Sequence, residues 1–161
     1  MKASRIRTLS EAVGLLAVVG SLVFVGLEVR QGAEATRAAT AQSLNDGWLE
    51  WNLTMSNPEN WRPVSRLFEL EDLSEATYED AAAVSSLMRS LFQHWSNLHW
   101  QYLKDQLDQR LWDGVLRNIE GNMRDLRWRR LMTWAWESQG HIYHDEFQRL
   151  FGAIVSPQTT R

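Results

Sequence analysis

The first third of the chain carries one long helical pattern that changes character along its length. Sixteen consecutive uncharged residues run from 12 to 27, inside a mainly apolar stretch over residues 9–29. Thr8 and Glu11 fit a capping box at its start, so we expect the helix to begin near Leu9. A bilayer core of about 30 Å needs roughly 20 residues at about 1.5 Å rise each. The pattern predicts a transmembrane helix over residues 9–29 that follows a basic tail, residues 1–8.

The two faces of this helix differ in the size of their side chains. At about 100° per residue, one face gathers small and polar residues and the opposite face gathers large aliphatic ones. In lipid, small residues let helices approach closely, so this seam predicts helix packing within the membrane. The alternative is that small residues are merely tolerated there. The seam comprises Gly14, Ala17, Ser21 and Glu28.

A cleaved signal peptide is an alternative to a membrane span. Lys2, Arg5 and Arg7 precede the apolar run, and residues 33–35 have the small-x-small form of a cleavage site. Charges between the apolar run and that site, and a helical pattern that continues through it, favour a retained helix. The basic residues ahead of the span favour an inside amino terminus, which would place the large domain outside.

The helical pattern extends beyond the apolar stretch over residues 30–56. Large apolar residues, Leu44, Trp48 and Trp51 among them, recur at helical spacing. Residues 45–47, Asn-Asp-Gly, are the expected position of a break. If the helix is continuous, one rod joins the membrane span to the domain that follows.

The remainder of the chain shows no strand pattern and has short connections. Ser74 is expected to cap the longest amphipathic helix, and Asp108 the one after it. An all-α fold follows, with the long apolar helix leading into an antiparallel helical bundle over residues 57–156 and a tail at 157–161. The expected helices cover residues 64–70, 81–102, 108–121, 123–138 and 145–155.

Composition narrows the range of functions. The net charge is −3, with 17 Lys and Arg against 20 Asp and Glu, which argues against nucleic acid as a partner. Cysteine is absent, so thiolate metal sites and cysteine nucleophiles are excluded. No phosphate loop, nucleophile elbow or metalloprotease motif is present. We therefore expect no enzymatic activity, no cofactor and no small-molecule substrate.

Four histidines raise a metal hypothesis. Glu137, His141 and His144 have the spacing of one helix face, but Gly140 interrupts that face. His94 and His99 fall on different sides of their helix. We predict no metal site, with a helical metalloenzyme as the least favoured of three hypotheses.

A second cluster combines arginine with tryptophan. Guanidinium groups pair with phosphate and an indole offers a stacking face, so the cluster could bind lipid phosphates or another anionic ligand. The alternative is an exposed helix face whose arginine stems cover tryptophan edges. The cluster comprises Arg124, Arg127, Trp128, Arg129 and Arg130.

Several segments together resemble a family of small bacterial proteins of unknown function. They are "LLAVVGSLVFVGLEVRQGAEATRAATAQSL", "NPENWRPVSRLF", "LSEATYEDAAAVSSLMRSLFQHWSNLHWQY" and "HDEFQRLF". The resemblance implies an all-α protein anchored in the bacterial cytoplasmic membrane by one span, and it carries over no catalytic residue. The basic tail is more positive than is typical of the family.

Three functional hypotheses follow. The first is a single-span membrane protein that acts through a protein partner or by forming a homo-oligomer, with the lipid bilayer around its first helix. The second is a soluble or secreted helical domain that binds an anionic ligand through the arginine cluster. The third is the metalloenzyme.

Overall fold

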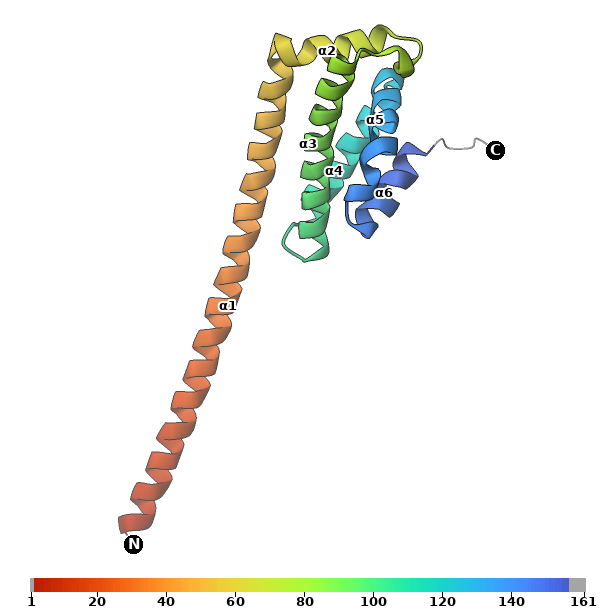
Figure 1. Cartoon of the computed structure of the whole chain (residues 1–161). Coiled ribbons are helices and arrows are strands. Elements are labelled where there is room, and N and C mark those ends of the chain that lie inside the picture. Colours follow the sequence, from red (N-terminus) through yellow and green to blue (C-terminus); the bar gives the residue numbers. More distant parts are fainter. Residues whose placement is uncertain (1, 157–161) are drawn as a thin grey trace. The chain divides into compact units, whose positions relative to one another are not determined.

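The computed structural model describes residues 2–156, with the side chains of residues 14–156, and these residues are all-α. The chain divides into two compact units, Met1–Ala39 and Thr40–Arg161, whose boundary lies inside the first helix. The expected tail at 157–161 and the side chains of the basic tail lie outside the described residues. The fold class predicted from the sequence is confirmed (Figure 1).

Helix α1, Lys2–Ser56, is longer and more regular than expected. It begins at Lys2 and not near Leu9, because the residues ahead of the apolar stretch are mainly good helix formers. The break predicted at Asn45–Gly47 is wrong, since α1 passes through these residues without interruption.

Packing explains why Gly47 lies inside a helix. A Cβ atom at this position would lie 2.2 Å from Cε1 of His94, so only glycine lets the imidazole approach the backbone of α1. The same ring meets Trp48 edge-on, with ring centroids 5.8 Å apart. Gly47 therefore serves close packing between α1 and α3 within the second unit, where it outweighs the low helix propensity of glycine.

The other helices lie close to their predicted positions. Their connections contain two short 3₁₀ turns, η1 (Leu73–Glu75) and η2 (Gly140–Ile142). The α-helices are α2 (Pro58–Glu69), α3 (Tyr78–Leu103), α4 (Gln109–Asn122), α5 (Leu126–Gln139) and α6 (Asp145–Val155).

Side-chain caps account for most of the differences at helix starts. Helix α2 begins earlier than expected because the side chain of Asn57 accepts the N–H of Glu59 and a proline occupies the first turn. Ser74 does not cap α3, because it lies within η1; Thr77 caps α3 instead. The cap predicted at Asp108 is confirmed.

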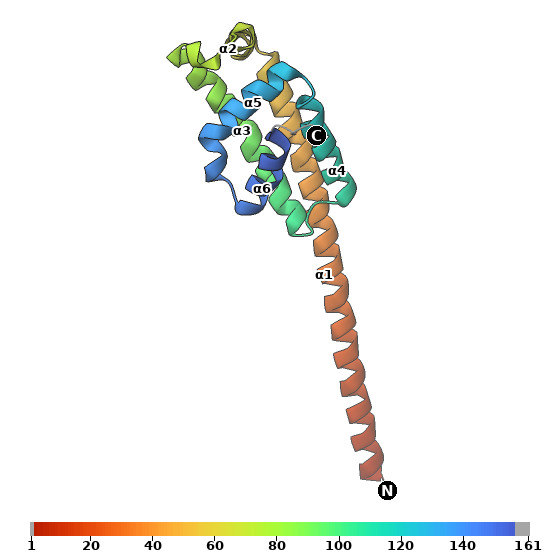
Figure 2. The ribbon, with the colours of Figure 1, turned by 90° about the vertical axis from the view of Figure 1, so that its right-hand side faces the viewer.

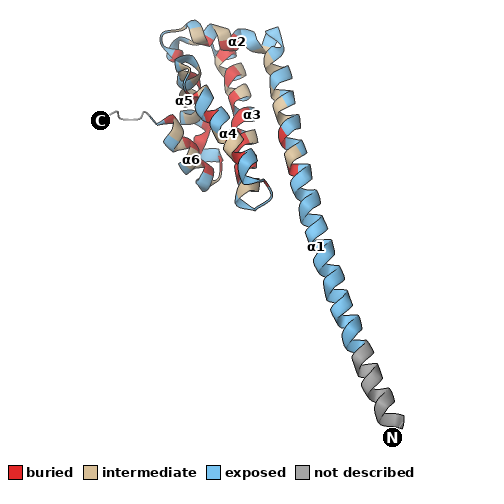
Figure 3. Cartoon of the chain, turned by 180° about the vertical axis from the view of Figure 1, so that it is seen from behind, coloured by how far each residue is buried: buried red, intermediate tan, exposed pale blue. Residues whose placement is uncertain are grey.

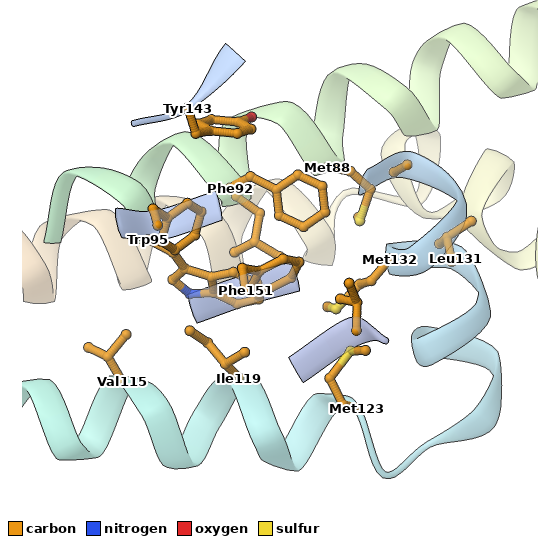
Figure 4. Close-up of a cluster of buried hydrophobic side chains, with 14 of the residues drawn as sticks. Met88, Phe92, Trp95, Val115, Ile119, Met123, Leu131, Met132, Tyr143 and Phe151 are labelled. Carbon is orange, nitrogen blue, oxygen red and sulfur yellow. The ribbon is translucent and has the colours of Figure 1, made fainter. Parts of the chain in front are cut away.

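Helix α3 lies at the centre of the second unit, and the core forms around it. Helices α4, α5 and α6 pack against α3, as two perpendicular views show (Figures 1 and 2). Phe92 and Trp95 of α3 are fully buried, and Phe151 of α6 lies 5.0 Å from Phe92 between ring centroids (Figure 4). Trp136 of α5 completes this aromatic core, 4.7 Å from Phe151.

An ion pair between a half-exposed arginine and a buried aspartate fixes α2 on α3. Arg66 donates through Nε to Oδ2 of Asp80 at 2.9 Å and through its terminal nitrogen to Oδ1. The hydroxyl of Thr77 donates to the same carboxylate at 3.0 Å. The hydrogen bond from Arg66 lowers the pKa of Asp80 below its usual range. Asp80 therefore stabilises the fold as an anion, and this contribution is lost as the pH falls below about 4.

We expect Gly47→Ala to destabilise the second unit, although alanine is the better helix former. The new Cβ displaces the ring of His94 from a packed position, at a cost of roughly 1–3 kcal/mol. Chemical unfolding of the full chain followed by tryptophan fluorescence measures the change.

Gly121→Ala in α4 is the matched control, because nothing lies within 4 Å of a Cβ at that position. It should leave stability unchanged or raise it. In a Gly47→Ala background, His94→Ala should cost less than it does alone, because both changes act on one contact. Wild-type stability of Gly47→Ala would contradict the proposed packing role.

Candidate functional site

The most unusual surface in the structure is the apolar part of α1. Every residue from 14 to 39 is exposed within its unit, including Leu16 at 70% and Phe24 at 61% of full accessibility (Figure 3). Among the described residues, α1 is the one helix long and apolar enough to cross a membrane. The exposed large apolar side chains here are Leu15, Leu16, Val18, Val19, Leu22, Val23, Phe24, Val25, Leu27 and Val29.

A serine within the same segment is satisfied by the helix itself. The hydroxyl of Ser21 donates to the carbonyl of Ala17 at 2.9 Å, a bond that needs no solvent. Beyond the apolar run, Arg30 pairs with Glu34 at 3.1 Å. The Ser21 hydroxyl is thus compatible with an apolar environment, and the carboxylate of Glu28 is exposed near the end of the apolar run.

The predicted packing seam lies on this exposed helix. Gly14, Ala17, Ser21 and Glu28 are all exposed in the first unit. A Cβ added at Gly14 would meet no atom within 4 Å, so this position is open to a neighbouring helix. Whether a helix packs there stays a prediction.

The arginine cluster is distributed among structural contacts. Arg130 reaches from α5 to the end of α2, where its guanidinium donates to the carbonyls of Leu67 and Glu71 at 3.1 Å each. Leu67 and Phe68, which Arg130 also contacts at 3.4 Å, have carbonyls that the end of α2 leaves without a partner, so Arg130 acts as a C-terminal cap supplied by another helix.

The other members of the cluster also have local partners. Arg127 pairs with Asp125, the cap of α5, and this hydrogen bond lowers the pKa of the Asp125 carboxyl. Arg129 donates to the carbonyl of Met123 at 2.7 Å. The ring of Trp128 meets Phe68 edge-on at 5.1 Å, and Arg124 is exposed. The structure thus favours the packing interpretation of this cluster over a free anion site.

The histidines do not gather as the metal hypothesis required. His94 packs on α1, whereas His99 stacks on His144 with ring centroids 5.3 Å apart. Among the described residues, no group of three or more His, Asp or Glu side chains is arranged to hold a metal ion. The pairing of His99 with His144 joins α3 to the start of α6 and could not be found from local spacing.

Shallow clefts lie on the second unit, and two of them adjoin residues considered above. One, of about 190 Å³, is lined by Trp51, Leu87 and His94 between α1 and α3. The other, of about 450 Å³, is lined by Leu126, Arg130 and other residues of α5. The guanidinium of Arg130 already donates to backbone carbonyls.

We expect Arg130→Met to destabilise the second unit by about 1–3 kcal/mol, because the end of α2 loses charged hydrogen bonds. Arg130→Lys should recover only part of this loss, since one ammonium cannot match the planar fork of donors. Arg124→Ala is the control and should leave the unfolding midpoint unchanged. Thermal unfolding of the three variants measures the differences, and equal midpoints for Arg130→Met and wild type would contradict the capping role.

Comparison with known proteins found no match to this chain. No family model matches the chain, and neither a curated protein nor a solved structure matches it. The function must therefore be argued from the geometry of this chain alone, in which the exposed apolar helix is the dominant feature.

Proposed function

We propose that this chain is a single-span membrane protein without catalytic activity, which acts through protein partners or through self-association, with Gly14, Ala17 and Ser21 as the packing seam of the span. One observation carries the proposal: the large apolar side chains of α1 between residues 15 and 29 are exposed around the whole helix.

Whether apolar side chains cover one side of the helix or all sides distinguishes a soluble protein partner from a membrane. A helix that packs on one neighbour has an apolar stripe and a polar opposite face, whereas a helix that is apolar all round requires an apolar surrounding. Ten large apolar side chains are exposed, and transfer from water at even about 1 kcal/mol each amounts to on the order of 10 kcal/mol. A lipid bilayer surrounds every side of such a helix with apolar groups.

The continuity of α1 supports retention of the span over its removal. The small-x-small site at residues 33–35 lies within α1, which continues as regular helix to Ser56. The residues after Thr40 belong to the second unit, where Leu44 is buried. A cleavage at residues 33–35 would leave this packed part of α1 in place but would detach the protein from the bilayer.

The chemistry of the second unit supports a binding role over an enzymatic one. Its charged groups form ion pairs and caps, as in Arg66 with Asp80 and in Arg130 at the end of α2. Buried aromatic rings fill its core. Its surface is helical and carries single exposed apolar residues such as Tyr78 and Leu126, which suits contact with protein partners or a second copy.

We expect the full chain to resist alkaline carbonate extraction from membranes and to retain its full-length mass. The variant Val19→Asp, Leu22→Arg should be released, because each charge near the centre of a span costs about 2.5–3.5 kcal/mol. Membrane fractionation with intact mass spectrometry measures both properties.

The matched control places the same charges outside the apolar run, as Leu49→Asp, Leu53→Arg. Both positions are exposed on α1 and should tolerate the change without release. Extraction of the unmodified full-length chain into the soluble fraction would refute the span. A product shortened near residue 35 would instead establish a cleaved signal.

We expect Gly14→Leu, Ala17→Leu to weaken self-association of the span at least several-fold, because the larger side chains keep two backbones apart. Leu15→Ala, Leu22→Ala on the opposite face is the control and should leave association unchanged. A reporter of transmembrane helix association in membranes measures both. Equal association of the seam variant and the wild type would contradict a role of the seam in self-association of the span.

A further inference from the structure

Two imidazoles from distant parts of the chain lie face to face in the second unit. His99 of α3 and His144, the residue before α6, have ring centroids 5.3 Å apart and planes inclined by 12°. Trp112 of α4 lies 5.1 Å from His99, and Trp100 lies 5.4 Å from His144. The pair is thus enclosed in an aromatic cluster at the point where α6 begins.

The hydrogen bonds of His144 define its protonation state. Its Nε2 lies 3.2 Å from the carbonyl oxygen of Ser96, which accepts only if Nε2 carries the hydrogen. Its Nδ1 accepts the backbone N–H of Phe147 at 3.3 Å, which requires a free lone pair. With these two partners a neutral ring both caps α6 and binds α3, whereas the contact of Nδ1 with Oε2 of Glu146, also at 3.3 Å, needs a hydrogen on Nδ1.

A proton on Nδ1 of His144 would exchange one partner for another. The N–H of Phe147 would lose its acceptor, and the new N–H would turn to Oε2 of Glu146, already 3.3 Å away. The exchange replaces a helix cap by an ion pair.

His99 has no such alternative partner. It is 7% exposed, and its Nδ1 is buried without a hydrogen bond. Burial lowers the pKa of His99, and the neighbouring His144 lowers it further, whereas Glu146 opposes both effects. The unfolded chain therefore binds more protons than the folded chain below about pH 6.5. This contribution to stability is complete above that pH and is lost as the pH falls.

Other charged groups near the pair come from all three helices around it. Nζ of Lys104, the residue after α3, lies 4.6 Å from the centre of the Trp100 ring, and Tyr102 of α3 donates to Gln109. On α4, Gln109 in turn donates to Asp113. On α6, Arg149 lies 3.9 Å from Glu146 and competes with the imidazole for that carboxylate.

We propose that the stacked pair of His99 and His144 is an acid-sensitive latch, which holds the start of α6 against α3 and releases it when the pair takes up a proton. Release would uncover the apolar face of α6, where Phe147 and Phe151 are fully buried in the closed form. Acidification would then regulate access to a surface for partners. The latch is independent of the membrane proposal, because it lies within the second unit.

Hydrogen exchange of the full chain in lipid nanodiscs or detergent tests the latch between pH 7.5 and 5.5, with rates corrected for intrinsic exchange. We expect the amides of α6 to lose protection at least about tenfold more than those of α3, since one pH unit across such a titration corresponds to a factor of ten. Constant relative protection of α6 in the wild type would overturn the proposal.

Variants separate the latch from general acid destabilisation. His144→Asn keeps a capping side chain and His99→Phe keeps the ring stack, but neither titrates, so each should reduce the pH dependence at α6 at least several-fold. His141→Asn, at an exposed position, should keep the wild-type response.

If His144→Asn fails to fold, the His99→Phe variant decides the test. In addition, NMR titration of the wild-type imidazoles must give His99 a midpoint below 6.5. An unchanged pH response at α6 in a folded His99→Phe variant, or a His99 midpoint at or above 6.5, would overturn the latch.

Discussion

The burial of α3 is the constraint on which the second unit depends. Nine of its residues are buried, and they spread over a wider face than one neighbouring helix can cover. Helices α4, α5 and α6 cover one part of this face, and the last turns of α1 cover another through Trp48 and His94. Loss of any one neighbour would expose part of the same aromatic core, so the helices of this unit are stable only together.

Polar side chains in this unit mainly connect helices. Arg66 joins α2 to Asp80 of α3, Arg130 joins α5 to the end of α2, and His144 joins the start of α6 to α3. Each of these groups also belongs to a residue type that catalyses reactions in other proteins. Their partners here are backbone carbonyls and one buried carboxylate. The sequence is therefore rich in charged residues although it shows no catalytic motif.

Local sequence pattern was sufficient for most of the helices and insufficient for the contacts between them. The apolar stripe of α3 and the cap at Asp108 are set by residues within a few positions of one another, and both were predicted. The role of Gly47 depends on His94, and that of Arg130 on α2, about sixty residues away. A glycine that permits close packing looks in sequence like a glycine that ends a helix, so only the structure distinguishes the two.

The sharing of α1 between the two units has a consequence for synthesis of the chain. The part of α1 around Gly47 that packs on α3 emerges from the ribosome well before its partner, since His94 follows 47 residues later. At about 5–20 residues per second this interval is roughly 2–10 s. During that time the tryptophans of α1 have no α3 to cover them, while the apolar residues before them are already available for insertion. With the first segment as the proposed membrane span, the nascent chain presents two adjacent apolar segments with different destinations, separated by the charged turn around Arg30 and Glu34.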